Sequence, residues 1–180
     1  MKTTGLTGGC VFKINMDKPK RKPTRLRNYD YSASGAYFIT ICTKNMFQYF
    51  GRIIVGEPLA APVNKLSYYG KIAESQLKSL PDRYENIEID KYVVMPNHIH
   101  FILRIKSGGA STSPTISDVV RTFKSLTMRE CRANGFNGET LFQRSFHDHI
   151  IRSEDDYKKI WEYIDTNVIR WKKDCFYSEC

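Results

Sequence analysis

The stretch YVVMPNHIHFIL, Tyr92 to Leu103, decides how this chain arranges its most unusual side chains. It is typical of a β-strand at both ends, yet it holds Pro96 and two histidines in the middle. Side chains two residues apart on a strand point to the same face, so His98 and His100 should project together while Ile99 points to the other face. Proline cannot donate to a sheet ladder, which predicts a break in the strand just before the pair.

Paired histidines on one strand face form a two-nitrogen claw. Neutral imidazole is a common metal ligand, and a pair held on one strand loses little further entropy when it closes on an ion. The alternative is that one or both rings pack and hydrogen-bond inside the sheet. All four histidines of the chain fall in two such pairs, His98/His100 and His147/His149, which gives weight to a functional interpretation.

Composition suggests one domain with a polyanionic partner. The chain has 180 residues, of which 41% are hydrophobic and 13% aromatic, enough for one well-buried core. It carries 28 Lys and Arg against 19 Asp and Glu, a formal net charge of +9. This excess favours nucleic acid as the partner, with an anionic membrane surface as the second possibility.

Several features argue for a cytoplasmic protein. No run approaches the roughly 18 apolar residues of a membrane span, and the N-terminus lacks the apolar core of a signal peptide. The five cysteines show no C-x-x-C spacing and leave one over from any pairing, so we expect reduced thiols with no disulfide framework or zinc knuckle.

The first 28 residues are basic and poor in apolar periodicity. We expect a flexible arm over residues 1–28, a single folded domain over 29–174 and a short tail over 175–180. The arm could follow a phosphate backbone or be a solvated tail of no consequence. The expected DNA-binding residues lie in this arm and on a later helix: Lys20, Arg21, Lys22, Arg25, Arg121 and Lys124.

The order of expected elements is β-β-α-β-β-α-β-α, which predicts an α+β fold. It suits one largely antiparallel sheet with helices on one face, leaving the other face free for a ligand. Residues 56–64 are expected to form a loop. The expected strands and helices are 35–43, 49–55, 67–80, 86–94, 98–105, about 114–133, 145–151 and about 154–172.

The last helix contains the segment YIDTN, Tyr163 to Asn167. An apolar stripe through Ile160, Ile164 and Val168 forms its expected core side, and Tyr163 lies about 120° from that stripe. Asn167 is four residues after Tyr163 and shares its side of the helix. Brought beside the histidine claw, these residues would place a phenol next to two nitrogens and one oxygen around an ion. A phosphodiester needs charge neutralisation and an aligned nucleophile, which this set could supply.

YVVMPNHIHFIL, FQRSFHDHIIR and YIDTN together resemble the single-tyrosine HUH transposases, most closely their REP-associated tyrosine transposase branch. The resemblance runs from about Leu26 to about Trp171. It implies a ferredoxin-like, RRM-like sandwich whose C-terminal helix carries the nucleophile. It further implies a Mg²⁺ or Mn²⁺ ion and a single-stranded DNA substrate that contains a hairpin, acted on by a monomer or homodimer.

Residue by residue, the resemblance makes His98 and His100 the HUH pair, Tyr163 the catalytic nucleophile and Asn167 the third metal ligand. His149 matches a position of the family to which we assign no role. The chain has Val168 where the family commonly has proline, so we expect the last helix to continue past Asn167.

Two other functions fit the same residues. A non-catalytic RRM-like module would bind nucleic acid by stacking bases on tyrosines, without metal dependence. A metal-dependent hydrolase could use all four histidines and a bound water, and would cut DNA without forming a protein–DNA adduct. The sequence also leaves open whether such a transposase acts on its own element or on dispersed host repeats.

Overall fold

The computed structural model describes residues 30, 32–54, 61–107 and 114–177. The arm over 1–28 lies outside these residues. The elements are β1 Gly35–Cys42, β2 Gly51–Ile54, β3 Val63–Leu66, α1 Tyr68–Lys78, β4 Ile87–Val94, β5 His98–Ile105, α2 Ile116–Ala133, β6 His147–Ile151 and α3 Glu154–Thr166, with single 3₁₀ turns at Lys44–Met46 and Trp171–Lys173.

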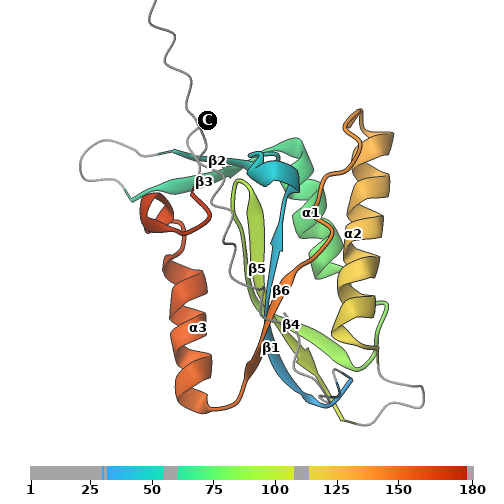
Figure 1. Cartoon of the computed structure of the whole chain (residues 1–180), viewed down its shortest axis with the longest axis vertical. Helices are drawn as coiled ribbons and strands as arrows, with labels where there is room; N and C mark the ends of the chain where they lie inside the picture. The colour runs from blue at the N-terminus through green and yellow to red at the C-terminus, as the bar shows by residue number, and fades with distance from the viewer. Residues whose placement is uncertain (1–29, 31, 55–60, 108–113, 178–180) are drawn as a thin grey trace, which may run out of the picture.

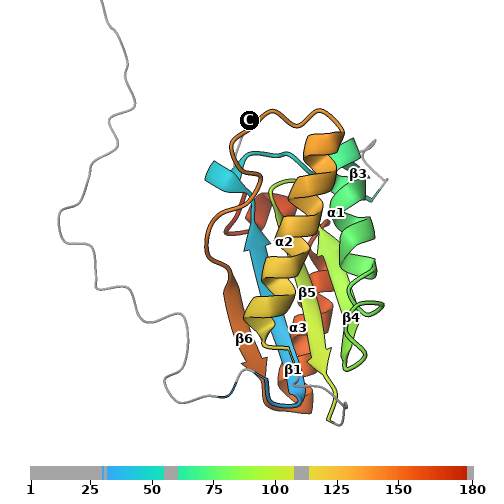
Figure 2. The same cartoon turned by 90° about the vertical axis from the view of Figure 1, so that its right-hand side faces the viewer.

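Four strands form one antiparallel sheet in the order β4-β5-β1-β6. Helices α1 and α2 cover one face of this sheet, and α3 lies against the other (Figures 1 and 2). The α+β fold with a mainly antiparallel sheet is therefore confirmed. The face that we expected to be free for a ligand is covered by the C-terminal helix.

The central strand β5 explains why the histidines are buried. Helices cover both faces of this strand, and seven of its eight residues are buried. Strands that are covered on both faces are commonly buried along their whole length. Ile99, Phe101 and Leu103 belong to the main core with α1 and α2. His98 and His100 alternate with them and therefore point to the α3 side, at the end of the strand that follows the Pro96 break.

Polar caps set the helix starts. Ser67 accepts a hydrogen bond from Gly70 N at the start of α1, and Ser153 accepts one from Asp156 N at the start of α3. Thr115 and Asp118 form a reciprocal capping box on α2. These caps match the predicted starts of the three helices to within about two residues, the usual uncertainty of such boundaries.

Two sequence-based boundaries were wrong. Helix α3 ends at Thr166 rather than near Lys172, because the chain turns back after Asn167 and the Asn167 side chain bonds to Asp174. Part of the expected loop 56–64 is strand: β3 begins at Val63 and pairs with β2 in a separate two-stranded ribbon. A four-residue strand is too short to show a reliable period.

Candidate active site

Three segments meet on the α3 side of the sheet. The rings of His98 and His100 come from β5 and lie 4.4 Å apart between centroids. Tyr163 and Asn167 come from the end of α3, and Asp174 follows the 3₁₀ turn after it. The side chains of His98, His100 and Asn167 are at most 1% exposed. The structure thus brings together the predicted histidine pair, tyrosine and asparagine, and adds one carboxylate.

Each histidine is oriented by a hydrogen bond on its Nδ1 side. His100 Nδ1 lies 2.8 Å from Thr40 Oγ1 on the neighbouring strand β1. His98 Nδ1 lies 2.8 Å from Asn97 Oδ1. Because Nδ1 of each ring is hydrogen-bonded, Nε2 is left for another partner. In metal sites, a hydrogen bond to one ring nitrogen commonly fixes the orientation of a histidine that binds the metal through the other.

The hydroxyl of Tyr163 lies between a histidine and a carboxylate. It is 3.3 Å from His100 Nε2 and donates to Asp174 Oδ2 at 3.2 Å. Asn167 Nδ2 donates to the same carboxylate oxygen at 2.8 Å. The Asp174 carboxylate is therefore the group that ties the tyrosine to the asparagine.

Burial controls the protonation of this site. Burial raises the pKa of Tyr163 above its ordinary value, and the charge of Asp174 raises this pKa further. Burial lowers the pKa of His98 and holds that of His100 well below its usual range. At neutral pH the site therefore holds a neutral phenol and two neutral imidazoles.

The donor set fits a divalent ion. His98 Nε2 and Asn167 Oδ1 are buried without a hydrogen-bond partner among the described residues. Such atoms are costly unless something else satisfies them. Ligand atoms of His98, His100 and Asp174 all lie within 4.8 Å of one another. Mixed nitrogen and oxygen ligands accept Mn²⁺ or Mg²⁺, and imidazoles also accept Zn²⁺.

The segment after α3 covers the histidines. The ring of Phe176 lies 4.7 Å from that of His98 and 5.8 Å from that of His100. Trp171 approaches His98 from the same segment, at 5.9 Å. Asn97 Nδ2 donates to the Phe176 carbonyl at 2.8 Å and so holds this cover in place.

The second histidine pair does not join this cluster. His147 and His149 are exposed on the edge strand β6, and His149 Nε2 lies 2.8 Å from Asp156 on α3. Within the described ranges, the group with metal-ligand spacing contains His98, His100 and Asp174 only. The four-histidine hydrolase is therefore not supported.

The predicted DNA-binding residues differ in where they lie and in what they contact. Lys20, Arg21, Lys22 and Arg25 lie outside the described residues. Arg121 is exposed and pairs with Asp118 on the same helix. Lys124 is partly buried and bonded to backbone carbonyls of the protein itself, which we had not expected. Its ammonium donates to the carbonyls of Gln143, Arg144 and Ser145 at 2.7, 3.3 and 3.0 Å, and burial lowers its pKa to about 8.

Asp174 is the residue of this site that sequence reasoning missed. It lies seven positions after Asn167 and beyond the end of α3, so no helical or strand period connects it with the other residues. The one available signal is that it is a lone acid in the basic segment RWKKD.

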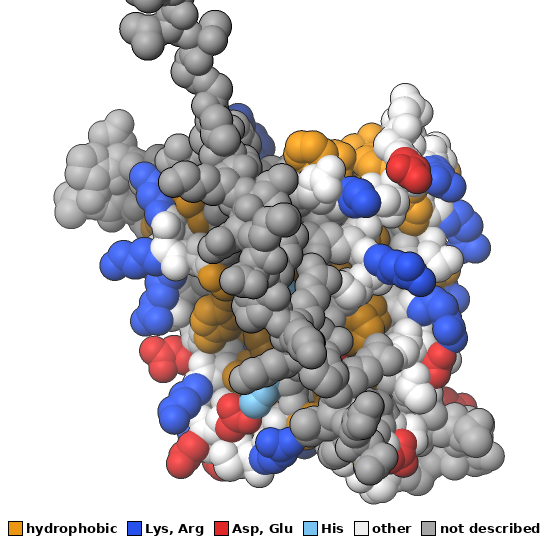
Figure 3. Space-filling view, viewed as in Figure 1, with side chains coloured by type: hydrophobic (Ala, Val, Ile, Leu, Met, Phe, Trp, Pro, Cys, Tyr) orange, Lys and Arg blue, Asp and Glu red, His pale blue; other side chains and the backbone are white. Residues whose placement is uncertain are grey.

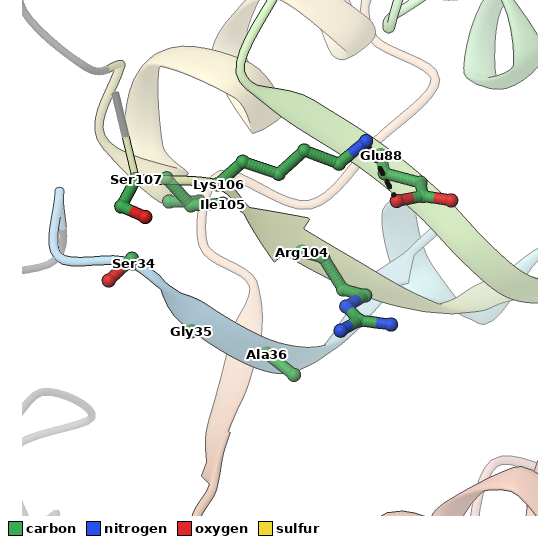
Figure 4. A pocket seen from close by; sticks show the side chains of 8 residues that line it. All are labelled: Ser34, Gly35, Ala36, Glu88, Arg104, Ile105, Lys106 and Ser107. Carbon is green, nitrogen blue, oxygen red and sulfur yellow. Dashed lines mark ion pairs between the residues drawn. The ribbon is translucent and has the colours of Figure 1, made fainter. Parts of the chain in front are cut away.

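A hollow lies at the other end of the sheet from the histidine cluster. It is lined by Gly35 at the start of β1 and by Arg104 and Lys106 near the end of β5, where Lys106 pairs with Glu88 at 3.2 Å (Figure 4). The register pairs Gly35 with Ile105 but Cys42 with His98. This hollow therefore lies away from the histidine cluster and holds none of its residues.

The chain is similar in sequence and in fold to known proteins. The family model described as "Transposase IS200 like" matches residues 69–167, a segment that includes both histidines of the claw, Tyr163 and Asn167. An uncharacterized protein of Haemophilus influenzae is 33% identical and aligns over 93% of this chain and 98% of its own length. Another protein of that organism, with the provisional name REP-associated tyrosine transposase, is 22% identical over 81% of this chain and 77% of its own length.

A solved structure has the same fold. It is that of a REP-associated tyrosine transposase bound to a REP hairpin, and it matches with a TM-score of 0.59. The two proteins are 21% identical, and the match covers 83% of this chain and 73% of the other.

Within the described residues, none of the helices has the length and apolar character that a membrane span requires.

Proposed function

Since the chain belongs to the IS200-like transposase family, we propose that it is a metal-dependent single-stranded DNA endonuclease and strand transferase with Tyr163 as nucleophile. The phenolic oxygen forms a bond to phosphorus while the bond from phosphorus to the 3′ oxygen breaks. The products are a 5′-phosphotyrosine and a free 3′-hydroxyl. This ester conserves the energy of the broken bond, so a 3′-hydroxyl can attack it later and rejoin the strands.

The observation that carries the proposal is the position of the Tyr163 hydroxyl, 3.3 Å from His100 Nε2 and 3.2 Å from Asp174 Oδ2. The raised pKa of Tyr163 means that the phenol must lose a proton as it attacks. Asp174 Oδ2 already accepts its hydrogen bond and takes that proton. The leaving 3′ oxygen then takes up the proton and departs as a hydroxyl, which balances the step.

His98 and His100 through Nε2 and Asn167 through Oδ1 would hold a divalent ion, Mg²⁺ or Mn²⁺, beside the negative charge of Asp174. When bound, such an ion withdraws charge from phosphoryl oxygens and lowers the pKa of a nearby hydroxyl. Thr40 and Asn97 fix the two imidazole rings, and Phe176 restricts the access of water to them.

The proposed substrate is single-stranded DNA at hairpin-containing repeats. It is supported by the net charge of +9 and by the similar structure, whose partner is a REP hairpin. The basic residues of the N-terminal arm and Arg121 are the proposed phosphate contacts. The engagement of Lys124 with three carbonyls leaves it out of this proposal.

Two labels on one hairpin oligonucleotide test the reaction. With Mn²⁺, the fragment labelled at its 3′ end should become attached to protein through its 5′ phosphate. The fragment labelled at its 5′ end should be released with a 3′-hydroxyl that a polymerase extends. Cleavage with both fragments free would indicate a water nucleophile, and no cleavage across a pool of hairpins with varied flanks would favour a binding module.

A further inference from the structure

The β2–β3 ribbon has two unlike faces. Its register pairs Arg52 with Lys65 and Ile54 with Val63, so these four side chains share one face, here called the outer face. All four are exposed. On the inner face, Asn64 Nδ2 donates to the Val94 carbonyl at 2.5 Å, which anchors the ribbon to the end of β4.

The side chains of the outer face destabilise the ribbon when nothing is bound to it. Two cations lie directly opposite each other, an arrangement that destabilises a strand pair. Ile54 and Val63 beside them are 39% and 61% exposed. The described ribbon residues, GRII and VNKL, include no acid that could neutralise the cations. This combination of charge and aliphatic surface is complementary to DNA, which offers phosphates and apolar base edges.

The ribbon lies next to the candidate active site. Phe50 N, just before β2, donates to the carbonyl of Pro96 at 3.0 Å, two residues before His98. The ribbon and the C-terminal end of α3 lie at the same end of the molecule (Figure 1). In the space-filling view, Lys and Arg side chains lie along the left edge, the side of the ribbon and α3, and also along the right edge (Figure 3). DNA bound to the ribbon would therefore lie at the end of the molecule that holds the C-terminal end of α3.

We propose that the outer face binds the duplex stem of the hairpin substrate in its major groove; this rests on the proposed function. A two-stranded ribbon fits that groove, where Arg binds guanine edges and aliphatic side chains contact thymine methyl groups. Proteins that hold an unpaired strand stack its bases on aromatic rings. The outer face has no aromatic side chain, which favours the duplex stem over the unpaired flank.

Lys65→Glu tests this contact without weakening the ribbon, because it places an acid opposite Arg52 and replaces repulsion with attraction. Lys159→Glu is the matched control. It makes the same charge change at an exposed position of α3, whose N-terminal half lies at the opposite end of the molecule from the ribbon (Figure 1). The affinity of each variant for a hairpin and for an unpaired strand of equal length is measured by fluorescence anisotropy over a range of salt concentrations.

Lys65→Glu should bind the hairpin at least about fivefold more weakly than the unchanged protein, while its melting temperature stays the same or rises. The slope of log K against log salt should fall by about 0.9 for each phosphate that the variant no longer neutralises. Lys159→Glu should bind the hairpin as the unchanged protein does, and neither change should alter binding of the unpaired strand.

Equal hairpin affinity of Lys65→Glu and the unchanged protein would overturn the proposal. So would an equal loss in Lys159→Glu, or an equal loss for the unpaired strand. Adduct formation by the unchanged protein is measured on the same hairpin, because this reaction tests Tyr163 separately from the ribbon. An adduct from the unchanged protein together with normal hairpin binding by Lys65→Glu refutes the ribbon contact alone. Selective loss of hairpin binding by Lys65→Glu, with no adduct from the unchanged protein, refutes the nucleophile alone.

Discussion

A divalent ion should raise the melting temperature of this protein. His98 Nε2 and Asn167 Oδ1 are buried without a partner among the described residues, and each such atom costs about 1–3 kcal/mol. An ion that binds only the folded state adds about 2.7 kcal/mol at 100 times its Kd. For a chain of 180 residues, each kcal/mol moves the melting temperature by about 2–4 °C. The expected increase is therefore about 5–10 °C.

The assay is thermal unfolding followed by circular dichroism, first with a chelator and then with increasing Mn²⁺. His98→Phe is the test variant, because it keeps an aromatic ring against Phe176 and Trp171 but removes the ligand nitrogen. His149→Ala is the control, because His149 is exposed and lies outside the cluster. His98→Phe should lose the ion-dependent increase, and His149→Ala should keep it.

The metal assignment would be refuted by an unchanged melting temperature at saturating Mn²⁺. It would also be refuted if His98→Phe gained as much stability from the ion as the unchanged protein. In either case, no ion at this site would offset the free-energy cost of burying His98 Nε2 and Asn167 Oδ1 without a partner among the described residues.

Three further results are expected. Asp174→Asn should weaken Mn²⁺ binding by about 10–100-fold in calorimetry, because a negative charge next to the ligands is removed; unchanged affinity would remove Asp174 from the site. Thr115→Ala should lower the free energy of unfolding by about 0.5–2 kcal/mol in urea titrations near pH 7. The hydrogen bonds from Thr115 lower the pKa of Asp118. The stability that the Asp118 carboxylate contributes is therefore present above the ordinary aspartate pKa and is lost as the pH falls through the lowered pKa. If Thr115→Ala lowered the free energy of unfolding equally in acid and at neutral pH, this reasoning would be contradicted. Removal of residues 1–22 should weaken DNA binding and flatten its salt dependence, whereas an unchanged slope would show that the arm makes no phosphate contacts.

The sequence predicted those parts of the site that follow a regular period. The i, i+2 spacing of His98 and His100 placed both on one strand face, and the i, i+4 spacing of Tyr163 and Asn167 placed both on one helix side. The structure has these arrangements. Local capping residues likewise indicated where the helices begin.

What the sequence did not predict depends on tertiary contacts. Asp174 reaches the site only because α3 ends at Thr166 and the chain turns back. The side of α2 that carries Lys124 could be read from its period, but the three carbonyls that bind its ammonium belong to a distant loop. The short strand β3 is defined by its pairing with β2, which four residues cannot reveal.

The identity of the attacking atom is tested most directly by mapping the covalent adduct. Protein incubated with a pool of hairpin oligonucleotides and Mn²⁺ is digested, and the peptide that carries a DNA phosphate is sequenced by mass spectrometry. Tyr157→Phe is the matched control, since this tyrosine lies on the same helix but bonds to Asp90, away from the histidines. We predict that the phosphate is found on Tyr163, that Tyr163→Phe binds DNA without forming an adduct, and that Tyr157→Phe still forms it. An adduct that persists in Tyr163→Phe, or a phosphate found on another residue, would contradict the central claim.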